Sequence, residues 1–524
     1  MRVIVSEPIS EQGLEILRRE ASVDVFLDLS AEDLASRLPG YDALLVRSQT
    51  KVTASLIAAG TDLKVIGRAG VGVDNIDVEA ASERGIIVVN APEGNIIAAA
   101  EHTMAMMAAL ARNIPAAHAS LCNAKWQRNS FIGVELYKKT LGIVGLGQVG
   151  SEVAKRAKGF DMRVIAFDPY VSTTRAEKLG VRLATLDEIW RESDFITFHV
   201  PKTKETAYMV GARELGLMKE GVRLVNCARG GIIDEAALCE AITSGKVGGA
   251  ALDVFESEPP GACPLLKLDQ VVGTPHLGGS TYEAQVNVAV EVAEQILAAL
   301  KGLPLTAAVN APSIPSEALA VLAPYITLAE HMGSFFVQAM DGGIHTVEIS
   351  CLGEIASYPV TPLTNSFLKG LFKIMLGNGI NAVNAPVLAR QRGIRISETK
   401  SASARDFANL VSVRVDTDQG TRTIAGTLFG TQEPRIVQLD GYRMDISPAP
   451  YMLVSEHIDK PGIIGKVGTI LGTHRVNIAG MQVGRKSIGG EAVMVLQVDH
   501  DLEAPVLRAV EEVDGIIGAR VVRL

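Results

Sequence analysis

The sequence predicts an α/β protein with two doubly wound parallel-sheet lobes, followed by an α+β middle domain and a small βαββαβ domain. Three observations predict this arrangement. Short apolar runs alternate with helical stretches from residue 2 to residue 300. Gly145, Gly147 and Gly150 join one of these runs to a helix. The alternation stops at a proline-containing segment, 312–316.

The composition is that of a globular chain with several cores. Of its 524 residues, 48% are hydrophobic and 21% are charged, which suits about three or four domains. A net charge of −9 without a run of Lys and Arg argues against a nucleic-acid binder. The chain begins directly with a strand and has no apolar run long enough to span a bilayer, so we expect a cytoplasmic protein outside the membrane.

The cysteines are scattered, with neither the spacing of metal ligands nor that of a disulfide framework. We therefore expect no metal site and a reducing compartment. They are Cys122, Cys227, Cys239, Cys263 and Cys351.

Residues 2–90 contain five β-rich runs separated by helical stretches such as 11–19. This pattern predicts a small parallel sheet of the flavodoxin-like type. Two runs end in polar loops, 47–50 and 67–75, and ligands of open α/β sheets bind beyond the carboxyl ends of the strands. We expect this lobe to hold substrate, although Arg47 and Arg68 taken singly could equally be solvated loop charges.

A helical pattern from Ala98 to Cys122 predicts one long helix that connects this lobe to the next. The next lobe begins with an apolar strand, 141–144, that runs into the glycine triplet. In a dinucleotide-binding turn Gly145 permits the sharp bend, Gly147 lets the backbone approach a pyrophosphate, and Gly150 lets helix and strand pack closely.

A second strand, 163–167, ends at Asp168. A carboxylate there accepts hydrogen bonds from the ribose hydroxyls and repels a 2′-phosphate, which favours NAD over NADP. A glycine triplet alone could be purely structural; the strand, the helix and the spaced acid together favour a Rossmann NAD lobe.

Four further strands, 195–200, 222–227, 249–254 and 271–274, bring this lobe to the six of a doubly wound sheet, with a helix at 235–243. A long amphipathic helix, 282–300, then returns to the first lobe.

Residues 313–447 predict a separate α+β domain, with helices at 318–340 and 363–376 and strands at 346–351, 410–416 and 422–428. From residue 451 the order strand, helix, two strands, helix and strand predicts a ferredoxin-like unit. Its first turn places His457 and Asp459 beside a helix N-terminus, which suits a small ligand.

Three polar residues follow apolar strands of the Rossmann lobe: Arg229, Glu258 and His276. Removing a hydride from an alcohol requires a base for the hydroxyl proton, and His has a suitable pKa. A paired carboxylate would orient the imidazole, and an arginine would bind a substrate carboxylate bidentately. Each residue alone could be structural; together, downstream of the NAD fingerprint, they predict a dehydrogenase site.

Four segments resemble signatures of the D-isomer-specific 2-hydroxyacid dehydrogenases: 145–150, 226–235, 249–259 and 275–281. Within that superfamily, segments 46–53 and 67–75 are similar to the D-3-phosphoglycerate dehydrogenase family. The resemblance covers the whole chain, including the intervening allosteric-substrate-binding domain and the C-terminal ACT domain of the long form. It implies NAD-dependent oxidation of D-3-phosphoglycerate to 3-phosphohydroxypyruvate, the first step of phosphorylated L-serine biosynthesis.

The resemblance also assigns residues and domains. It implies a substrate-binding lobe at 1–97 and 284–312, an NAD lobe at 98–283, a middle domain at 313–447 and an ACT domain at 448–524. It implies that NAD contacts Gly145, Gly147, Gln148, Val149, Gly150, Asp168, Val200, Cys227, Arg229, Asp253, His276 and Gly278. It implies substrate contacts from Arg47, which would bind the phosphate, from Asn95, and from Arg128 out of another subunit. Val71 replaces a frequent Thr, so we expect no side-chain hydrogen bond there.

His457, Asp459 and Asn477 match positions that bind L-serine in serine-inhibited relatives, which implies an allosteric effector site between two subunits. ACT units and dehydrogenase lobes usually pair, so we expect a homo-oligomer, either a dimer or a tetramer.

Two alternatives remain open from the sequence. Another D-2-hydroxyacid dehydrogenase, acting on glycerate, glyoxylate or 2-hydroxyglutarate, would leave Arg47 without a phosphate partner. An NAD-sensing binding protein would not need the set of Arg229, Glu258 and His276.

Overall fold

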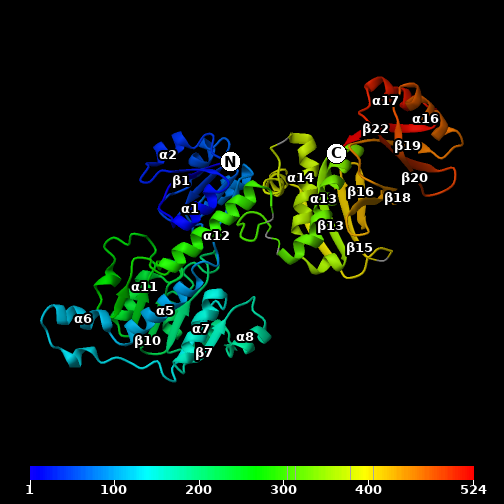
Figure 1. The fold of residues 1–524 in the computed structure, drawn as a ribbon. Helices are drawn as coiled ribbons and strands as arrows, with labels where there is room; N and C mark the ends of the chain where they lie inside the picture. Colours follow the sequence, from blue (N-terminus) through cyan, green and yellow to red (C-terminus); the bar gives the residue numbers. More distant parts are fainter. Residues whose placement is uncertain (304, 313, 315, 378, 405) are drawn as a thin grey trace.

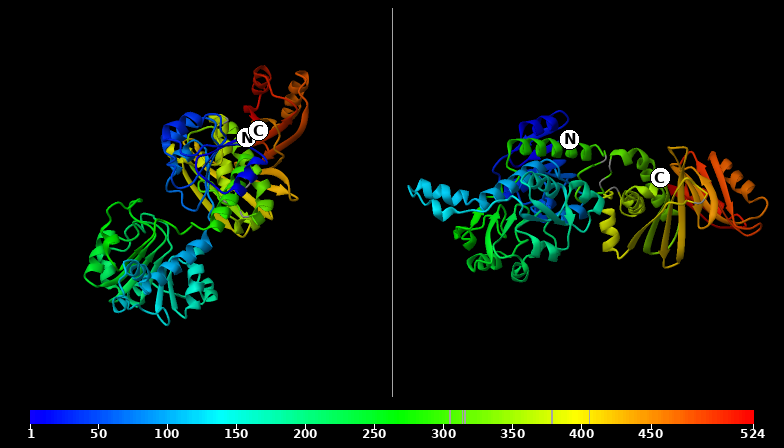
Figure 2. Two further views of the ribbon diagram at one scale, coloured as in Figure 1. Left: turned by 60° about the vertical axis from the view of Figure 1, so that its left-hand side comes forward. Right: turned by 90° about the horizontal axis from the view of Figure 1, so that it is seen from below.

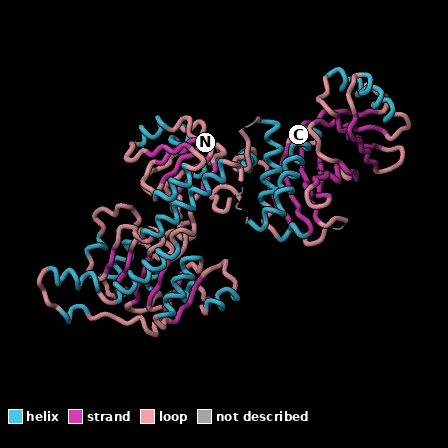
Figure 3. The backbone as a smooth tube through the Cα atoms, in the orientation of Figure 1, coloured by secondary structure: helices cyan, strands magenta, loops and turns pink. Residues whose placement is uncertain are grey.

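The computed structural model describes residues 1–524 except 304, 313, 315, 378 and 405, and except the side chains of 316 and 317. The chain forms two lobes that are joined to a middle domain and a terminal domain (Figure 1). The left view of Figure 2 sets the second lobe apart from the rest of the molecule. Helices flank the sheets of both lobes (Figure 3).

The first lobe is a five-stranded sheet of order β2-β1-β3-β4-β5, with every pair parallel. This confirms the predicted flavodoxin-like sheet. Strands β1, β3, β4 and β5 are mostly buried, as parallel strands covered on both faces must be, while the edge strand β2 is partly exposed. Its elements are β1 (Arg2–Val5), α1 (Glu11–Arg18), β2 (Ser22–Val25), α2 (Ala31–Arg37), β3 (Ala43–Val46), α3 (Ala54–Ala59), β4 (Val65–Arg68), α4 (Val78–Glu83) and β5 (Ile87–Val89).

The prediction of one helix over 98–122 is wrong. The structure has two helices, α5 (Ile96–Ala111) and α6 (Ile114–Cys122), separated by Asn113 in the left-handed conformation at φ 53°. Pro115 explains the break, because in a continuous helix its ring would clash with a carbonyl of the preceding turn and its nitrogen would have no N–H to donate. Apolar periodicity continues across the break and hides it. Helix α6 consequently projects from the lobe as an arm (Figure 1).

The second lobe is a seven-stranded parallel sheet of order β12-β11-β10-β9-β6-β7-β8. The prediction of six strands omitted β8 (Arg182–Leu183), a two-residue edge strand too short to show periodicity. The remaining strands are β6 (Thr140–Val144), β7 (Arg163–Phe167), β9 (Phe195–Phe198), β10 (Val222–Asn226), β11 (Val247–Leu252) and β12 (Val271–Gly273). The helices are η1 (Arg128–Phe131), α7 (Gln148–Gly159), α8 (Thr173–Leu179), α9 (Leu186–Glu192), α10 (Ala212–Leu217), α11 (Glu235–Thr243) and η2 (Pro264–Lys267).

Helix α12 (Tyr282–Leu300) runs from the second lobe back onto the first. A Cβ at Gly13 of α1 would lie 2.7 Å from the carbonyl oxygen of Ala289, so the two helices touch backbone to backbone. Val292 and Ile296 reach the sheet at Gly67. The return helix therefore completes the core of the first lobe.

The middle domain has a six-stranded sheet of order β14-β13-β15-β16-β17-β18 covered by helices. The sequence did not predict three of its strands or α15, because they are short or carry polar side chains on the exposed face. The elements are α13 (Ser316–Ala339), β13 (Ile344–Gly353), η3 (Glu354–Ser357), α14 (Thr361–Leu376), α15 (Ala385–Gln391), β14 (Arg395–Ser401), β15 (Asn409–Thr417), β16 (Gly420–Phe429), β17 (Glu433–Leu439) and β18 (Tyr442–Ile446).

Within the described residues, one helix is long and apolar enough to cross a membrane, Ala318–Ala339. Its buried side chains, among them Leu328, Met332 and Phe335, belong to the core of the middle domain. A core helix passes the same test of length and hydropathy, so this helix is explained by its packing.

The terminal domain has the predicted βαββαβ order in an antiparallel sheet, β20-β21-β19-β22. One face carries its own helices, while Met452, Val454 and Val522 on the other face join the core of the middle domain. The two domains therefore share a core. The elements are β19 (Tyr451–Ile458), α16 (Ile463–Thr473), β20 (Ile478–Arg485), β21 (Glu491–Val498), α17 (Ala504–Glu511) and β22 (Ile516–Arg523).

Candidate active site

Two adjoining cavities of about 480 and 320 Å³ lie where the carboxyl ends of the strands of both lobes meet. Asn95, His276 and Gly279 line both cavities. A ligand in one cavity would therefore reach a ligand in the other beside His276. The crevice is where open α/β sheets bind their ligands.

His276 and Glu258 form a hydrogen-bonded pair at this junction. Nδ1 of His276 donates to Oε2 of Glu258 at 2.7 Å, and Oε1 of Glu258 accepts from the backbone N–H of Phe255 at 3.2 Å. About half of the His276 side chain is exposed, so its other ring nitrogen is open to the cavities that it lines.

The hydrogen bond that His276 donates to Glu258 raises the pKa of His276 above its ordinary value, although partial burial acts in the opposite direction. Burial would raise the pKa of Glu258, but the hydrogen bond and the charge of His276 outweigh it and leave that pKa lowered. The pair therefore holds an ionised carboxylate against an imidazole that readily accepts a proton.

Asp253 orders the loop that carries His276. Its carboxylate is fully buried and accepts from the backbone N–H groups of Leu277 at 2.7 Å and Gly278 at 2.8 Å. Thr274 Oγ1 donates to the same carboxylate at 2.6 Å, and His102 Nε2 lies 3.2 Å from it. The structure thus places Asp253 beneath the loop, and the sequence interpretation overlooked His102 and Thr274 as its partners.

Arg229 follows β10 and faces the first lobe across the crevice. Its Nε donates to Oδ2 of Asp74 at 3.2 Å, and its Nη1 donates to the carbonyl of Ala228 at 2.7 Å. Arg229 lines the smaller cavity, next to His276. A bound carboxylate could still use its second terminal nitrogen.

The larger cavity is lined by three cations, Arg47, Lys51 and Arg68. Arg47 follows β3, and its Nη1 donates to the carbonyl of Pro8 at 3.1 Å. Arg68, whose role the sequence left open, has a buried Nε with no hydrogen-bond partner among the described residues. Burial and the neighbouring charge of Arg229 lower the pKa of Arg68 to about 10. A cavity lined by such a cluster of cations suits an anion.

The turn between β6 and α7 has the geometry that a dinucleotide needs. Gly145 has φ +96°, and a Cβ at Gly150 would lie 2.1 Å from the carbonyl oxygen of Gly145. A Cβ at Gly147 would meet open space, so that glycine leaves room outside the fold. Asp168, at the end of β7, accepts from the backbone N–H groups of Leu146 at 2.8 Å and Tyr170 at 2.9 Å. These residues fit NAD.

The smaller cavity gathers most of the remaining residues that the resemblance assigned to NAD. Those lining it are Gln148, Val149, Val200, Cys227, Arg229, His276 and Gly278. Burial, with the charge of Asp253, raises the pKa of Cys227 to about 12. Its thiol is therefore neutral, and Cys227 acts there as an apolar wall.

Arg128 does not reach these cavities within one chain. It is exposed on the arm, in a shallow hollow of about 240 Å³ with Leu121, Trp126 and Phe131. Trp126 is 83% exposed. An exposed apolar group of this kind is typical of a protein interface.

Of the three residues expected to bind an effector, Asp459 and Asn477 have side-chain partners inside the chain. Oδ2 of Asp459 accepts from Nη1 of Arg485 at 3.0 Å, and Nδ2 of Asn477 donates to Asp499 at 2.9 Å. His457 is buried, and burial lowers its pKa. Its Nδ1 has no hydrogen-bond partner among the described residues.

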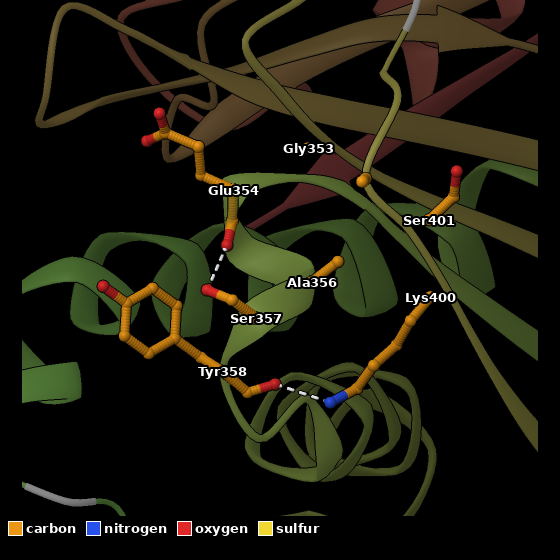
Figure 4. Close-up of a pocket in the computed structure, with 8 residues that line it drawn as sticks. Gly353, Glu354, Ala356, Ser357, Tyr358, Lys400 and Ser401 are labelled. Atoms are coloured by element: carbon orange, nitrogen blue, oxygen red, sulfur yellow. Dashed lines mark hydrogen bonds between the residues drawn. The ribbon is translucent and has the colours of Figure 1, made fainter.

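A further hollow of about 620 Å³ lies in the middle domain, far along the chain from the crevice (Figure 4). Its one lining cation, Lys400, donates to the carbonyl of Tyr358 at 2.7 Å, and Ser357 donates to the carbonyl of Glu354. Lys400 and Ser357 thus bond to backbone carbonyls within the hollow, and we assign it no ligand. Across the described part of the chain, His, Cys, Asp and Glu form no group of three suited to a metal ion.

Three family models match the chain in succession. Residues 104–278 match the NAD-binding domain of the D-isomer specific 2-hydroxyacid dehydrogenases. Residues 321–440 match the D-3-phosphoglycerate dehydrogenase intervening domain, and residues 451–515 match the ACT domain.

Full-length relatives agree with these matches. The chain is 49% identical to D-3-phosphoglycerate dehydrogenase of Archaeoglobus fulgidus over the whole of both chains. It is 48% identical to the Synechocystis enzyme of the same name, over all of this chain and 95% of that one. Among solved structures, D-lactate dehydrogenase of Aquifex aeolicus with NAD and lactic acid is 30% identical, with a TM-score of 0.51, over 58% of this chain and 96% of that one.

Proposed function

Because the chain belongs to the D-3-phosphoglycerate dehydrogenase family, we propose that it oxidises D-3-phosphoglycerate to 3-phosphohydroxypyruvate with NAD, the first step of phosphorylated L-serine biosynthesis. The observation that carries this proposal is the His276–Glu258 pair at the junction of an NAD cavity and a cation-lined cavity. The first cavity suits the cofactor, and the second suits a phosphorylated acid.

The acid–base work falls to His276. Its Nε2 takes the proton of the substrate 2-hydroxyl, and Glu258 stabilises the imidazolium that forms. Arg229 binds the substrate carboxylate and polarises the adjacent carbon–oxygen bond. The residues that line the smaller cavity would hold NAD, which would supply the acceptor for the hydride of the same carbon. The glycine turn, with Asp168, Gln148 and the other lining residues, holds NAD, and Asp253 keeps the His276 loop in place.

The phosphate separates this substrate from its rivals. Arg47 and Arg68, with Asn95 beside them, would have no anionic partner if the substrate were glycerate or glyoxylate. A neutral end of the substrate would leave the buried Nε of Arg68 unsatisfied, which costs more than a missing surface contact.

The test is NADH formation from D-3-phosphoglycerate, D-glycerate and D-2-hydroxyglutarate at equal concentrations, with a step that consumes the phosphorylated product. We expect a clear preference for the phosphorylated acid. Equal turnover of an unphosphorylated acid would overturn the substrate assignment and leave the dehydrogenase mechanism standing. No turnover of any acid would favour an NAD-binding protein.

We also propose a homo-oligomer in which the α6 arm pairs with a second copy. The exposed Leu121, Trp126 and Ile132 supply the apolar surface, and pairing would carry Arg128 towards the partner subunit's crevice. Trp126→Glu should at least halve the mass measured by light scattering. Tyr170→Glu, a change at an exposed residue away from the arm, is the control and should leave the mass unchanged.

We propose four domains: a substrate-binding lobe of residues 1–97 and 284–312, an NAD lobe of 98–283, a middle domain of 313–447 and an ACT domain of 448–524. We also propose that the protein is located in the cytoplasm. L-Serine is proposed to bind between two ACT domains at His457, Asp459 and Asn477, with Asp459 exchanging Arg485 for the ammonium group. An initial rate that is unchanged at millimolar serine would contradict this regulation.

A further inference from the structure

The loop that carries Arg47 is held by a buried acid from another strand. Glu7 follows β1 and is 5% exposed. Its Oε1 accepts from the backbone N–H groups of Arg47 at 2.8 Å and Thr50 at 2.9 Å, and its Oε2 accepts from Gln49 at 3.1 Å. Three donors from a four-residue loop thus converge on one carboxylate.

The opposite side of the same loop is held by an amide. Nδ2 of Asn75 donates to the carbonyls of Arg47 at 2.8 Å and Thr50 at 2.7 Å. Glu7 and Asn75 together hold N–H and C=O groups at both ends of the loop. The direction in which the Arg47 side chain leaves the backbone therefore depends on these two residues.

Glu7 is ionised in this setting. Burial would raise its pKa, but the hydrogen bonds from Thr50, Gln49 and Arg47 outweigh burial and lower it. Its negative charge also favours the charged form of the buried Arg68. Glu7 therefore supports both arginines while it stays outside the residues that line the cavity.

Because Glu7 occupies the N–H groups of Arg47, Gln49 and Thr50, those three groups cannot serve a bound anion. Recognition of the substrate phosphate therefore depends on the Arg47 side chain, which must be correctly aimed. We propose that Glu7 is a positioning residue that sets the preference for a phosphorylated substrate by holding the 47–50 loop. This inference rests on the proposed function and adds a determinant of its specificity.

The test is Glu7→Gln in the full-length protein, with KM and kcat measured for D-3-phosphoglycerate and D-glycerate. Glutamine keeps the shape but turns an N–H group towards the loop donors. We expect the KM for the phosphorylated acid to rise roughly ten-fold or more, with kcat within about two-fold and the KM values for D-glycerate and NAD unchanged. Glu15→Gln, at an exposed carboxylate of α1, is the matched control and should change nothing.

Glu7→Asp keeps the charge on a shorter side chain, so its KM for D-3-phosphoglycerate should lie between those of wild type and Glu7→Gln. This variant serves as the test if Glu7→Gln does not fold. Equal rises in KM for both acids would show a general structural role and overturn the inference, as would an unchanged KM ratio. A wild-type protein that does not prefer the phosphorylated acid would instead overturn the proposed function itself.

Discussion

Nδ1 of His276 lies 2.7 Å from Oε2 of Glu258, so the imidazole and the carboxylate act as one acid–base unit. Glu258 raises the pKa of His276, and oxidation requires the imidazole to be neutral. We expect kcat/KM for oxidation to rise with pH, with its midpoint above the ordinary histidine value of about 6.5. Reduction requires the imidazolium and should decline over the same range. A midpoint at or below the ordinary value in a pH–rate profile would contradict this assignment.

Glu258→Gln should move the midpoint of the oxidation profile to lower pH, because the imidazolium loses its anionic partner. The same loss should lower kcat by roughly 10²-fold. NAD binding, followed by protein fluorescence, should persist. Glu256→Gln, at a neighbouring exposed acid outside the pair, is a control for local charge and should leave the midpoint in place.

His276→Ala should abolish most turnover while NAD still binds. The reason is that the variant has no group to take the hydroxyl proton. Steady-state rates and a binding titration together decide the point. A variant that retains its turnover would mean that another base performs the step.

Arg47→Ala and Arg68→Ala should each raise the KM for D-3-phosphoglycerate by roughly 10- to 100-fold, since each would remove a charge-assisted contact with the phosphate. The KM for D-glycerate should change little. Arg47→Lys keeps the charge without the forked guanidinium, so its KM for D-3-phosphoglycerate should lie between those of wild type and Arg47→Ala. Arg84→Ala, at an arginine on the far side of the lobe bound to the carbonyl of Ala58, is the control.

The glycine turn predicts three different outcomes. Gly150→Ala would place Cβ 2.1 Å from the carbonyl oxygen of Gly145, so both the melting temperature and NAD affinity should fall. The Cβ of Gly147→Ala would meet open space in the protein, so the melting temperature should not change. The same Cβ would occupy the room that Gly147 leaves for the pyrophosphate, so NAD affinity should drop. Gly159→Ala also meets open space, at the end of α7, and should affect neither. Calorimetry and NAD titration separate the three.

Local patterns predicted the elements whose own residues carry the signal. The strands on both sides of the glycine turn and the helices α11 and α12 lie where apolar periodicity and caps placed them. The same patterns failed at Asn113, where a left-handed residue breaks a continuous apolar run, and at β8, which has two residues. Neither feature alters the spacing of apolar residues.

The residues of the candidate site also fall into two groups, those that sequence motifs selected and those that only the structure identified. Arg229, Glu258 and His276 each follow an apolar strand and stand in a recognisable motif, so the sequence was enough to select them. Glu7 stands in no such motif, and Arg68 stands in the 67–75 segment, where the sequence alone did not distinguish its side chain from a solvated loop charge. The role of Glu7 depends on its hydrogen bonds to a loop 40 residues away, and the role of Arg68 on a buried Nε that has no partner among the described residues.

By itself, the sequence determined the fold class, the family and the chemistry of the pair at the crevice. The spacing of motifs and the order of strands and helices along the chain depend on neighbouring residues, so the folded protein keeps them. Tertiary structure alone decided which cations share a cavity, which acid holds the loop of Arg47, and that Arg128 stands on an arm outside the crevice of its own chain. Those relations join distant segments, and only packing brings their atoms within hydrogen-bonding distance.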